Sequence, residues 1–205
     1  MAGKPKWLRA HGTPWVRGAA TPLFENPWIS VTRYAATAPT GKAATYGLVS
    51  YKNYAVAILP VFDDGTTILV GQHRFPLGDY SWEIPEGGGP LGEDPLESAR
   101  RELAEETGLQ AATWQEILQA QLSNSVSDER AFGYLATGLS AAADAHHADE
   151  TEDLAQVRVP FREALDAATA GDLKDMLTVA MLLKAYHMAR EGHLAPALAR
   201  VMLGA

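Results

Sequence analysis

Three glutamates crowd the second half of one short predicted helix, and their spacing could hold a divalent cation. Glu102 and Glu106 lie one turn apart on one helical face, with Glu105 beside them. Neighbouring carboxylates repel one another, and the C-terminal half of a helix favours cations. Mg²⁺ or Mn²⁺, which take hard oxygen ligands, would relieve this repulsion, neutralise phosphate charge and activate a water. The alternative is a solvated acidic face without a metal.

The flanking residues predict a loop, a helix and a second loop that would position these glutamates. Asp94 suits the N-cap and Pro95 the first helical position, while Gly108 suits the position just past the helix end. Arg101 precedes Glu105 by four residues, so an ion pair could hold that side chain. A buried stripe at helical spacing would consist of Leu96, Ala99 and Leu103.

Residues 87–109 read GGGPLGEDPLESARRELAEETGL and fit a known pattern at every specified position. The pattern is G-x5-E-x7-R-E-φ-x-E-E-x-G-φ, in which φ is a bulky aliphatic residue. This segment resembles the Nudix box, and the chain resembles a Nudix hydrolase. The resemblance implies a pyrophosphatase that hydrolyses phosphoanhydride bonds with Mg²⁺ or Mn²⁺ as cofactor. A nucleotide-sensing Nudix module without catalysis is an alternative, although such a module would not need the box carboxylates.

The flanks of the box look like the ADP-ribose pyrophosphatase branch. Residues 71–74 (GQHR) and 82–87 (WEIPEG) are similar to its Q-x-R segment and its E-x-P-A-G approach. The resemblance implies hydrolysis of ADP-ribose or a nucleotide sugar to a nucleoside monophosphate and a phosphorylated moiety. Two departures weigh against ADP-ribose itself: Glu86 replaces an alanine, and a proline expected near Ser125 is absent. A house-cleaning pyrophosphatase for nucleoside triphosphates is the alternative enzyme.

The resemblance also implies roles for individual carboxylates. The catalytic group would include Glu105 and Arg101. A glutamate of the acidic loop at 149–153, Glu150 or Glu152, would act as general base for the attacking water or support a metal. The alternative for this loop is a solvated surface segment. The metal ligands would be the backbone carbonyl of Glu86 and the side chains of Glu102, Glu106 and Glu105.

Substrate contacts are implied for four residues outside the box. Trp28 and Tyr46 stand where aromatic side chains of this branch stack on the base, although an aromatic residue in a strand usually serves packing. Arg74 could reach a phosphate or pair with an acidic neighbour, and Glu83 belongs to the same substrate-binding group. The branch also implies a homodimer that exchanges its N-terminal sheet between subunits.

The remaining pattern predicts an α/β fold: the Nudix α/β/α sandwich with a mixed sheet, at 53–205, preceded by a small N-terminal antiparallel β subdomain at 1–52. Residues 54–62 and 67–75 flank Asp63-Asp64-Gly65, a hairpin signal, whereas 114–122 is ambiguous. The other expected strands are 28–36, 44–51, 131–137 and 154–159, and the other helices are 161–170 and 173–190. The expected core of the last helix consists of Met176, Leu177, Met181 and Leu182.

Composition excludes several classes of protein. With 205 residues and 47% hydrophobic content, the chain can bury one good core. A net charge of −8 argues against a nucleic-acid partner. The absence of cysteine excludes disulfides and zinc–thiolate sites. Without a long apolar run, no membrane association is expected, and the chain is interpreted as cytoplasmic.

Overall fold

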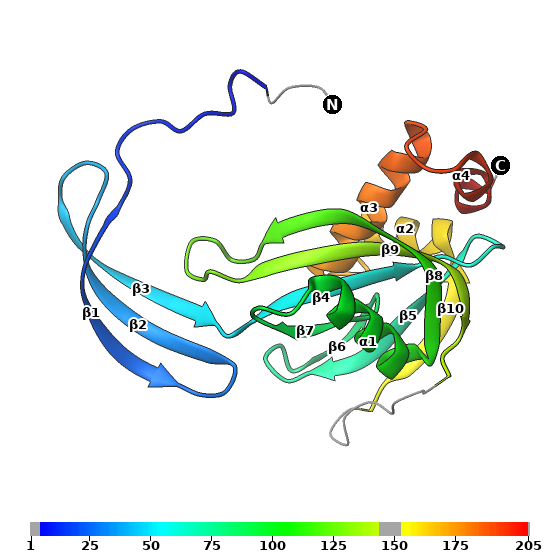
Figure 1. The fold of residues 1–205 in the computed structure, drawn as a ribbon, viewed down its shortest axis with the longest axis horizontal. Coiled ribbons are helices and arrows are strands. Elements are labelled where there is room, and N and C mark those ends of the chain that lie inside the picture. Colours follow the sequence, from blue (N-terminus) through cyan, green and yellow to red (C-terminus); the bar gives the residue numbers. More distant parts are fainter. Residues whose placement is uncertain (1–4, 144–152, 205) are drawn as a thin grey trace. The chain divides into compact units, whose positions relative to one another are not determined.

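The computed structural model describes residues 5–143 and 153–204, which divide into two compact units (Figure 1). The smaller unit contains the chain up to Lys52 together with the turn Ser123–Asp128. The larger unit contains Asn53–Leu122 and the chain from Glu129 onward.

The smaller unit is an antiparallel three-stranded sheet in the order β1-β2-β3. Its strands are β1 (Val16–Glu25), β2 (Ile29–Thr37) and β3 (Ala43–Tyr51). The predicted N-terminal antiparallel sheet is confirmed, and β1 is an additional strand. The sequence of β1, VRGAATPLFE, contains glycine and proline, both unfavourable in strand interiors, and lacks a regular alternation of polar and apolar residues.

The larger unit contains two sheets. The mixed sheet has the order β7-β4-β9-β8, in which β4 runs parallel to β9 and the other pairs are antiparallel. Its strands are β4 (Asn53–Pro60), β7 (Glu86–Pro90), β8 (Leu109–Gln121) and β9 (Arg130–Ala141). The second sheet is antiparallel and consists of β10 (Ala155–Pro160), β5 (Thr66–Arg74) and β6 (Asp79–Glu83). The ambiguous segment 114–122 is therefore largely strand.

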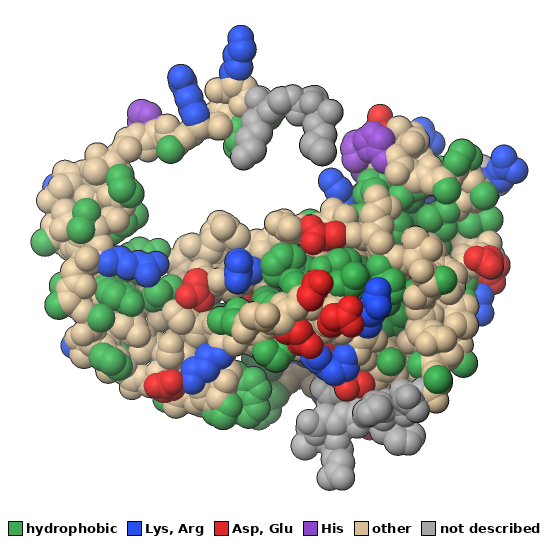
Figure 2. Space-filling view, in the orientation of Figure 1, with side chains coloured by type: hydrophobic (Ala, Val, Ile, Leu, Met, Phe, Trp, Pro, Cys, Tyr) green, Lys and Arg blue, Asp and Glu red, His purple; other side chains and the backbone are tan. Residues whose placement is uncertain are grey.

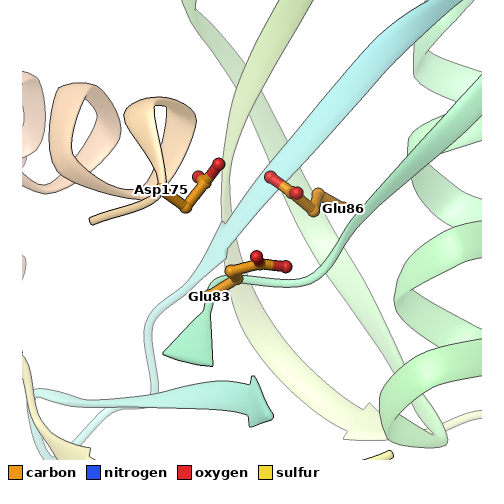
Figure 3. Close-up of side chains that lie close together, drawn as sticks. All are labelled: Glu83, Glu86 and Asp175. Atoms are coloured by element: carbon orange, nitrogen blue, oxygen red, sulfur yellow. The ribbon is translucent and has the colours of Figure 1, made fainter. Parts of the chain in front are cut away.

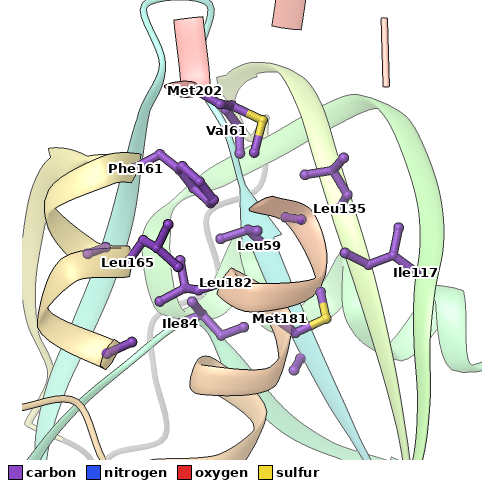
Figure 4. Packing of buried hydrophobic residues seen from close by; sticks show 14 of the residues in the cluster. Leu59, Val61, Ile84, Ile117, Leu135, Phe161, Leu165, Met181, Leu182 and Met202 are labelled. Carbon is purple, nitrogen blue, oxygen red and sulfur yellow. The ribbon is translucent and has the colours of Figure 1, made fainter. Parts of the chain in front are cut away.

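Strand β4 is buried on both faces, and the alternation of its side chains creates two cores. Val56 and Ile58 pack with Leu103 of α1 (Pro95–Thr107). Ala57 and Leu59 face the opposite core, which Figure 4 shows. That core is covered by α2 (Phe161–Ala170), α3 (Met176–Arg190) and α4 (Pro196–Leu203). The predicted α/β/α sandwich with a mixed sheet is thus confirmed.

The predicted hairpin around Asp63-Asp64-Gly65 is wrong in its pairing. The turn forms, since Phe62 N–H donates to the Thr66 carbonyl at 2.9 Å and Val61 bridges Thr67. Beyond it, however, β4 and β5 enter different sheets. The reason is tertiary: β4 pairs with β7 and β9, and β5 pairs with β10 and β6, so neither has an edge left for the other.

Helix boundaries differ at the C-terminal end of the chain. Helix α3 begins at Met176 rather than at residue 173, because the Asp175 side chain accepts a hydrogen bond from Thr178 N–H at 2.7 Å and caps the helix. Met176 is 66% exposed and does not belong to the core, whereas Leu177, Met181 and Leu182 are buried as predicted. In the part of the chain that the structure describes, no helix is long and apolar enough to span a bilayer.

A two-residue connection joins the two sheets of the larger unit. Glu83 ends β6 in one sheet, and Glu86 begins β7 in the other. Between them, Ile84 N–H donates to the Thr178 hydroxyl at 3.0 Å. The Pro85 carbonyl accepts from Ile58 N–H at 2.8 Å. The connection is therefore anchored to both α3 and β4.

Replacement of Thr178 by valine should destabilise the protein. Thr178 is completely buried, and valine would leave the buried Ile84 N–H without its acceptor at nearly constant side-chain volume. We expect the free energy of unfolding to fall by about 1 to 3 kcal/mol, measured by urea denaturation. The matched control is Thr169→Val on the exposed side of α2, with an expected change within about 0.5 kcal/mol. Equal stability of both variants would contradict this anchoring role.

Candidate functional site

Helix α1 begins and ends at the residues that the sequence predicts. The Asp94 side chain accepts a hydrogen bond from Leu96 N–H at 3.0 Å, and Pro95 is the first helical residue. Gly108 ends the helix in the left-handed conformation, with φ of 67°, and its N–H donates to the Ala104 carbonyl at 2.9 Å. Buried Leu103 holds the helix against the mixed sheet. The helix is thereby fixed in position relative to β7.

Two of the box glutamates lie against the backbone at the start of β7. A β-carbon added to Gly87 would lie 2.2 Å from Cδ of Glu102, so only glycine leaves room for this carboxylate. Glu106 is only 5% exposed, and its Oε2 accepts from Glu86 N–H at 3.0 Å. The glycine of the box therefore brings a strand backbone into contact with helix carboxylates.

Arg101 lies among several glutamates and contacts the backbone as well. Its Nη2 donates to the Gly88 carbonyl at 2.9 Å and to Glu102 Oε1 at 3.1 Å. Its Nη1 lies 3.5 Å from Glu93, while the predicted partner, Glu105, is the most distant at 3.8 Å from Nε. Figure 2 shows acidic and basic side chains interspersed over α1. The geometry makes Arg101 a clamp between β7 and the helix, with closer contacts to Glu102 than to Glu105.

Arg74 pairs with two carboxylates from opposite ends of the sheet connection. Its Nε donates to both oxygens of Glu83 at 3.0 Å, and Nη2 makes a further contact with Glu83 Oε2. The same Nη2 donates to Glu86 Oε1 at 2.7 Å. Of the two sequence interpretations of Arg74, pairing with acidic neighbours is therefore observed. Glu83, interpreted as a substrate contact, is buried and bound to this guanidinium.

The other oxygen of Glu86 differs from the one that Arg74 binds. Oε2 is buried and accepts no hydrogen bond from the described residues. Burial, together with the nearby negative charges of Asp175 and Glu83, raises the pKa of Glu86 well above its ordinary value, although Arg74 opposes this rise. The side chain that replaces the expected alanine therefore adds a carboxyl group in an environment that disfavours its charge.

Asp175 is the functional candidate that sequence reasoning missed. Glu83, Glu86 and Asp175, here called the acidic cluster, each offer an oxygen within 4.8 Å of the others. Figure 3 shows their carboxylates pointing toward a common centre. The available sequence signal was Asp175-Met-Leu-Thr178, an N-cap pattern before an apolar helix. That pattern reveals a cap but not the neighbours that the fold brings beside it.

A cavity of about 330 Å³ opens beside the acidic cluster. Arg74, Glu86 and Asp175 line it together with Gly87 of the box. Carboxylate and carbonyl oxygens on this cavity and on α1 are the hard ligands that Mg²⁺ and Mn²⁺ prefer. The larger unit thus contains a polar cavity beside acidic groups suited to a divalent cation.

The remaining predicted site residues lie elsewhere or outside the described residues. Glu150 and Glu152 fall in the segment that the structure does not describe. Trp28 is 65% exposed, at the turn between β1 and β2. Tyr46 lines a separate cavity of about 230 Å³ in the smaller unit, where its hydroxyl donates to the Ser125 carbonyl and its ring packs edge-on against Trp15.

The strand register separates the two predicted base-stacking residues. Trp28 directly precedes Ile29, which pairs with Tyr51, and Tyr46 lies five residues from Tyr51 along β3. At about 3.3 Å per residue, the two positions are roughly 17 to 20 Å apart along the sheet. Trp28 and Tyr46 of one chain therefore cannot stack on opposite faces of the same base.

Known proteins resemble this chain in sequence. Residues 52–178, more than half of the chain, match the NUDIX domain. The ADP-ribose pyrophosphatase of Mycobacterium tuberculosis is 36% identical over 161 residues, covering 77% of this chain and 76% of that protein. The ADP-ribose pyrophosphatase of Bacillus subtilis is 36% identical over 140 residues, 68% of this chain and 75% of the relative. The methanol dehydrogenase activator of Bacillus methanolicus is 32% identical over 141 residues, 69% of this chain and 76% of the relative.

A solved structure resembles the fold. The crystal structure of an ADP compounds hydrolase superposes with a TM-score of 0.79 at 21% sequence identity, covering 91% of this chain and all of that one. The agreement at this low identity concerns the fold alone. Together with the domain match and the 36% identity over 77% of this chain, the box on α1 leads to one conclusion: the chain belongs to the Nudix family.

Proposed function

We propose that this protein is a Nudix pyrophosphatase that hydrolyses the diphosphate bond of a nucleoside diphosphate linked to a second moiety. The products are a nucleoside monophosphate and the phosphorylated moiety. The observation that carries the proposal is the contact between the start of β7 and the box carboxylates Glu102 and Glu106. The two relatives at 36% identity bear the name ADP-ribose pyrophosphatase, which favours ADP-ribose or another ADP-sugar as substrate.

Mg²⁺ or Mn²⁺ is the proposed cofactor, and the residues present fit such an ion. Glu102 fills the space that Gly87 leaves, so the helix carboxylate and the strand backbone already lie together. The proposed ligands are the Glu86 carbonyl and the side chains of Glu102, Glu105 and Glu106. When bound, the cation supplies charge neutralisation on the diphosphate and activation of the attacking water.

The protein side chains contribute positioning and proton transfer. Arg101 bridges Gly88 and Glu102 and holds the helix carboxylate against β7. The Glu86 N–H orients Glu106 through its hydrogen bond at 3.0 Å. We assign the general base to a carboxylate of the acidic loop, Glu150 or Glu152, because the attacking water must lose a proton.

We further propose a cytoplasmic homodimer in which the smaller unit supplies base contacts. Strand β1 is exposed along its whole length and lies at the edge of its sheet, together with exposed Phe24 and Trp28. A bare apolar edge favours association with a second copy. Because Trp28 and Tyr46 are far apart along one sheet, any base held between both residues would need one residue from each subunit.

Turnover against a panel of nucleotides tests the proposed reaction. ADP-ribose, ADP-glucose, GDP-mannose, NADH and nucleoside triphosphates would be compared with Mg²⁺ and with Mn²⁺. We expect the highest kcat/KM for an ADP-sugar. The Glu106→Gln variant should lose turnover by at least about 100-fold, because an amide replaces an anionic ligand. A preference for triphosphates would favour the house-cleaning alternative. Binding of nucleotides without turnover would favour the sensor. A fully active Glu106→Gln variant would contradict the role of Glu106 as a metal ligand.

Gly87→Ala should reduce turnover with little loss of stability. The added β-carbon displaces the Glu102 carboxylate, which is the flexible end of a side chain and can move at small cost. We expect kcat to fall about 100-fold while the melting temperature remains within about 4 °C. Gly47→Ala in β3, where a β-carbon meets no atom within 4 Å, is the matched control and should retain parental activity. Parental turnover of Gly87→Ala would refute the proposed contact.

Trp28→Ala should affect binding more than chemistry. If the exposed indole stacks on the base, its loss should raise KM for an ADP-sugar about five- to 100-fold, corresponding to roughly 1 to 3 kcal/mol, with kcat nearly unchanged. Steady-state kinetics give both parameters, and light scattering on the same samples gives the oligomeric state. Trp7→Ala, at another exposed tryptophan, is the control. An unchanged KM would exclude Trp28 from the base site.

A further inference from the structure

We propose that the acidic cluster (Glu83, Glu86 and Asp175) is a second divalent-cation site, adjacent to the box glutamates but built from different side chains. It uses side-chain oxygens from the end of β6, the start of β7 and the cap of α3. Figure 3 shows the three carboxylates converging from these elements. The proposed box side chains Glu102, Glu105 and Glu106 come from α1, so the side chains of the two sites can be altered separately.

The distances within the cluster suit a small hard cation. Its three oxygens lie within 4.8 Å of one another. Ligands on opposite sides of Mg²⁺ are about 4.2 Å apart, and those around Ca²⁺ about 4.8 Å, twice the metal–oxygen distance. Little movement of the side chains would therefore complete a coordination shell, with waters from the adjoining cavity in the remaining positions.

The charge in the cluster is only partly balanced. Arg74 provides one positive charge against three carboxylates, leaving two negative charges when all three are ionised. Glu83 is 3% exposed, so solvent screens this excess poorly. A divalent cation carries the charge that would balance it.

One carboxylate of the acidic cluster has an oxygen that no described residue binds. Glu86 Oε2 is buried and receives no hydrogen bond from the described residues, whereas Oε1 is bound by Arg74. Buried polar atoms are normally satisfied, and an unsatisfied one costs about 1 to 3 kcal/mol. Asp175 caps α3 through Oδ2, which leaves Oδ1 for a cation. The Glu86 oxygen is an observation independent of the spacing of the cluster, and it supports a cation at this position.

Mn²⁺ binding in the absence of any nucleotide tests the proposal on the full-length protein. The number of bound ions and their affinities would be measured by electron paramagnetic resonance of free Mn²⁺. Glu86→Gln keeps the side-chain volume and the backbone carbonyl. Asp175→Asn keeps the helix cap, since asparagine caps as well as aspartate. We expect each variant to bind one Mn²⁺ fewer than the parent, or to bind that ion at least ten-fold more weakly.

Two further variants separate this cluster from the box and from general charge effects. Asp94→Asn makes the same substitution at the N-cap of α1, outside the cluster, and should bind Mn²⁺ like the parent. Glu102→Gln should weaken binding at the box while one Mn²⁺ remains on the cluster. Anomalous diffraction from Mn²⁺-soaked crystals should then show a peak among the three cluster carboxylates.

Several outcomes would overturn the second site. Parental Mn²⁺ binding by Glu86→Gln and Asp175→Asn would indicate that a proton on Glu86, rather than a cation, relieves the charge. A loss in only one of these variants would exclude a site that needs both ligands. Loss of all Mn²⁺ in Glu102→Gln would show that the cluster does not bind a cation on its own. None of these results depends on substrate turnover. Failure of the proposed cation site can therefore be distinguished from failure of the proposed hydrolysis.

Discussion

Negative charge held away from water is the constraint on which this site depends. Glu83 and Glu106 are almost fully buried, and buried ions cost several kcal/mol each unless partners compensate for lost hydration. The compensation differs between them: Arg74 pairs with Glu83, whereas a backbone N–H of β7 contacts Glu106. Arg74 also binds Glu86, and the Glu86 N–H is the donor to Glu106, so both arrangements meet at the short connection through Ile84 and Pro85. The anchoring of that short connection is therefore as important to the chemistry as the carboxylates themselves.

Close approach of backbone to carboxylate explains why the box begins with glycine. At Gly87 the strand passes within reach of the Glu102 side chain, and any β-carbon would occupy the carboxylate position. Gly89 is similarly restricted by the Tyr54 ring. The glycines in β7 thus serve steric rather than conformational needs, since none of them has a positive φ. The pattern of the box is a packing requirement as well as a chemical one.

The glutamate that stands where the branch pattern has alanine before the box glycine changes the electrostatics of the site. The Glu86 backbone takes part in β7 pairing, opposite Ala57. Its side chain, however, adds a third carboxyl group beside those of Glu83 and Asp175. One residue therefore serves two neighbouring sites: its main chain faces the box, and its side chain faces Arg74.

Helix α1, the family and the fold class could be predicted from the sequence, because their signals are local. The cap at Asp94, the glycine at Gly108 and the helical spacing of Glu102 and Glu106 predict helix α1, because these signals act within a few residues. The family and the sandwich follow from the same pattern. Strand pairing was not readable in this way: the signal at Asp63-Asp64-Gly65 predicts a turn, but the partners of β4 and β5 depend on distant strands. Likewise, the sequence distance between Glu86 and Asp175 conceals their proximity. Only the packing of α3 against the sheet connection decided that Asp175 joins Glu83 and Glu86, because long-range contacts arise from the whole core rather than from local spacing.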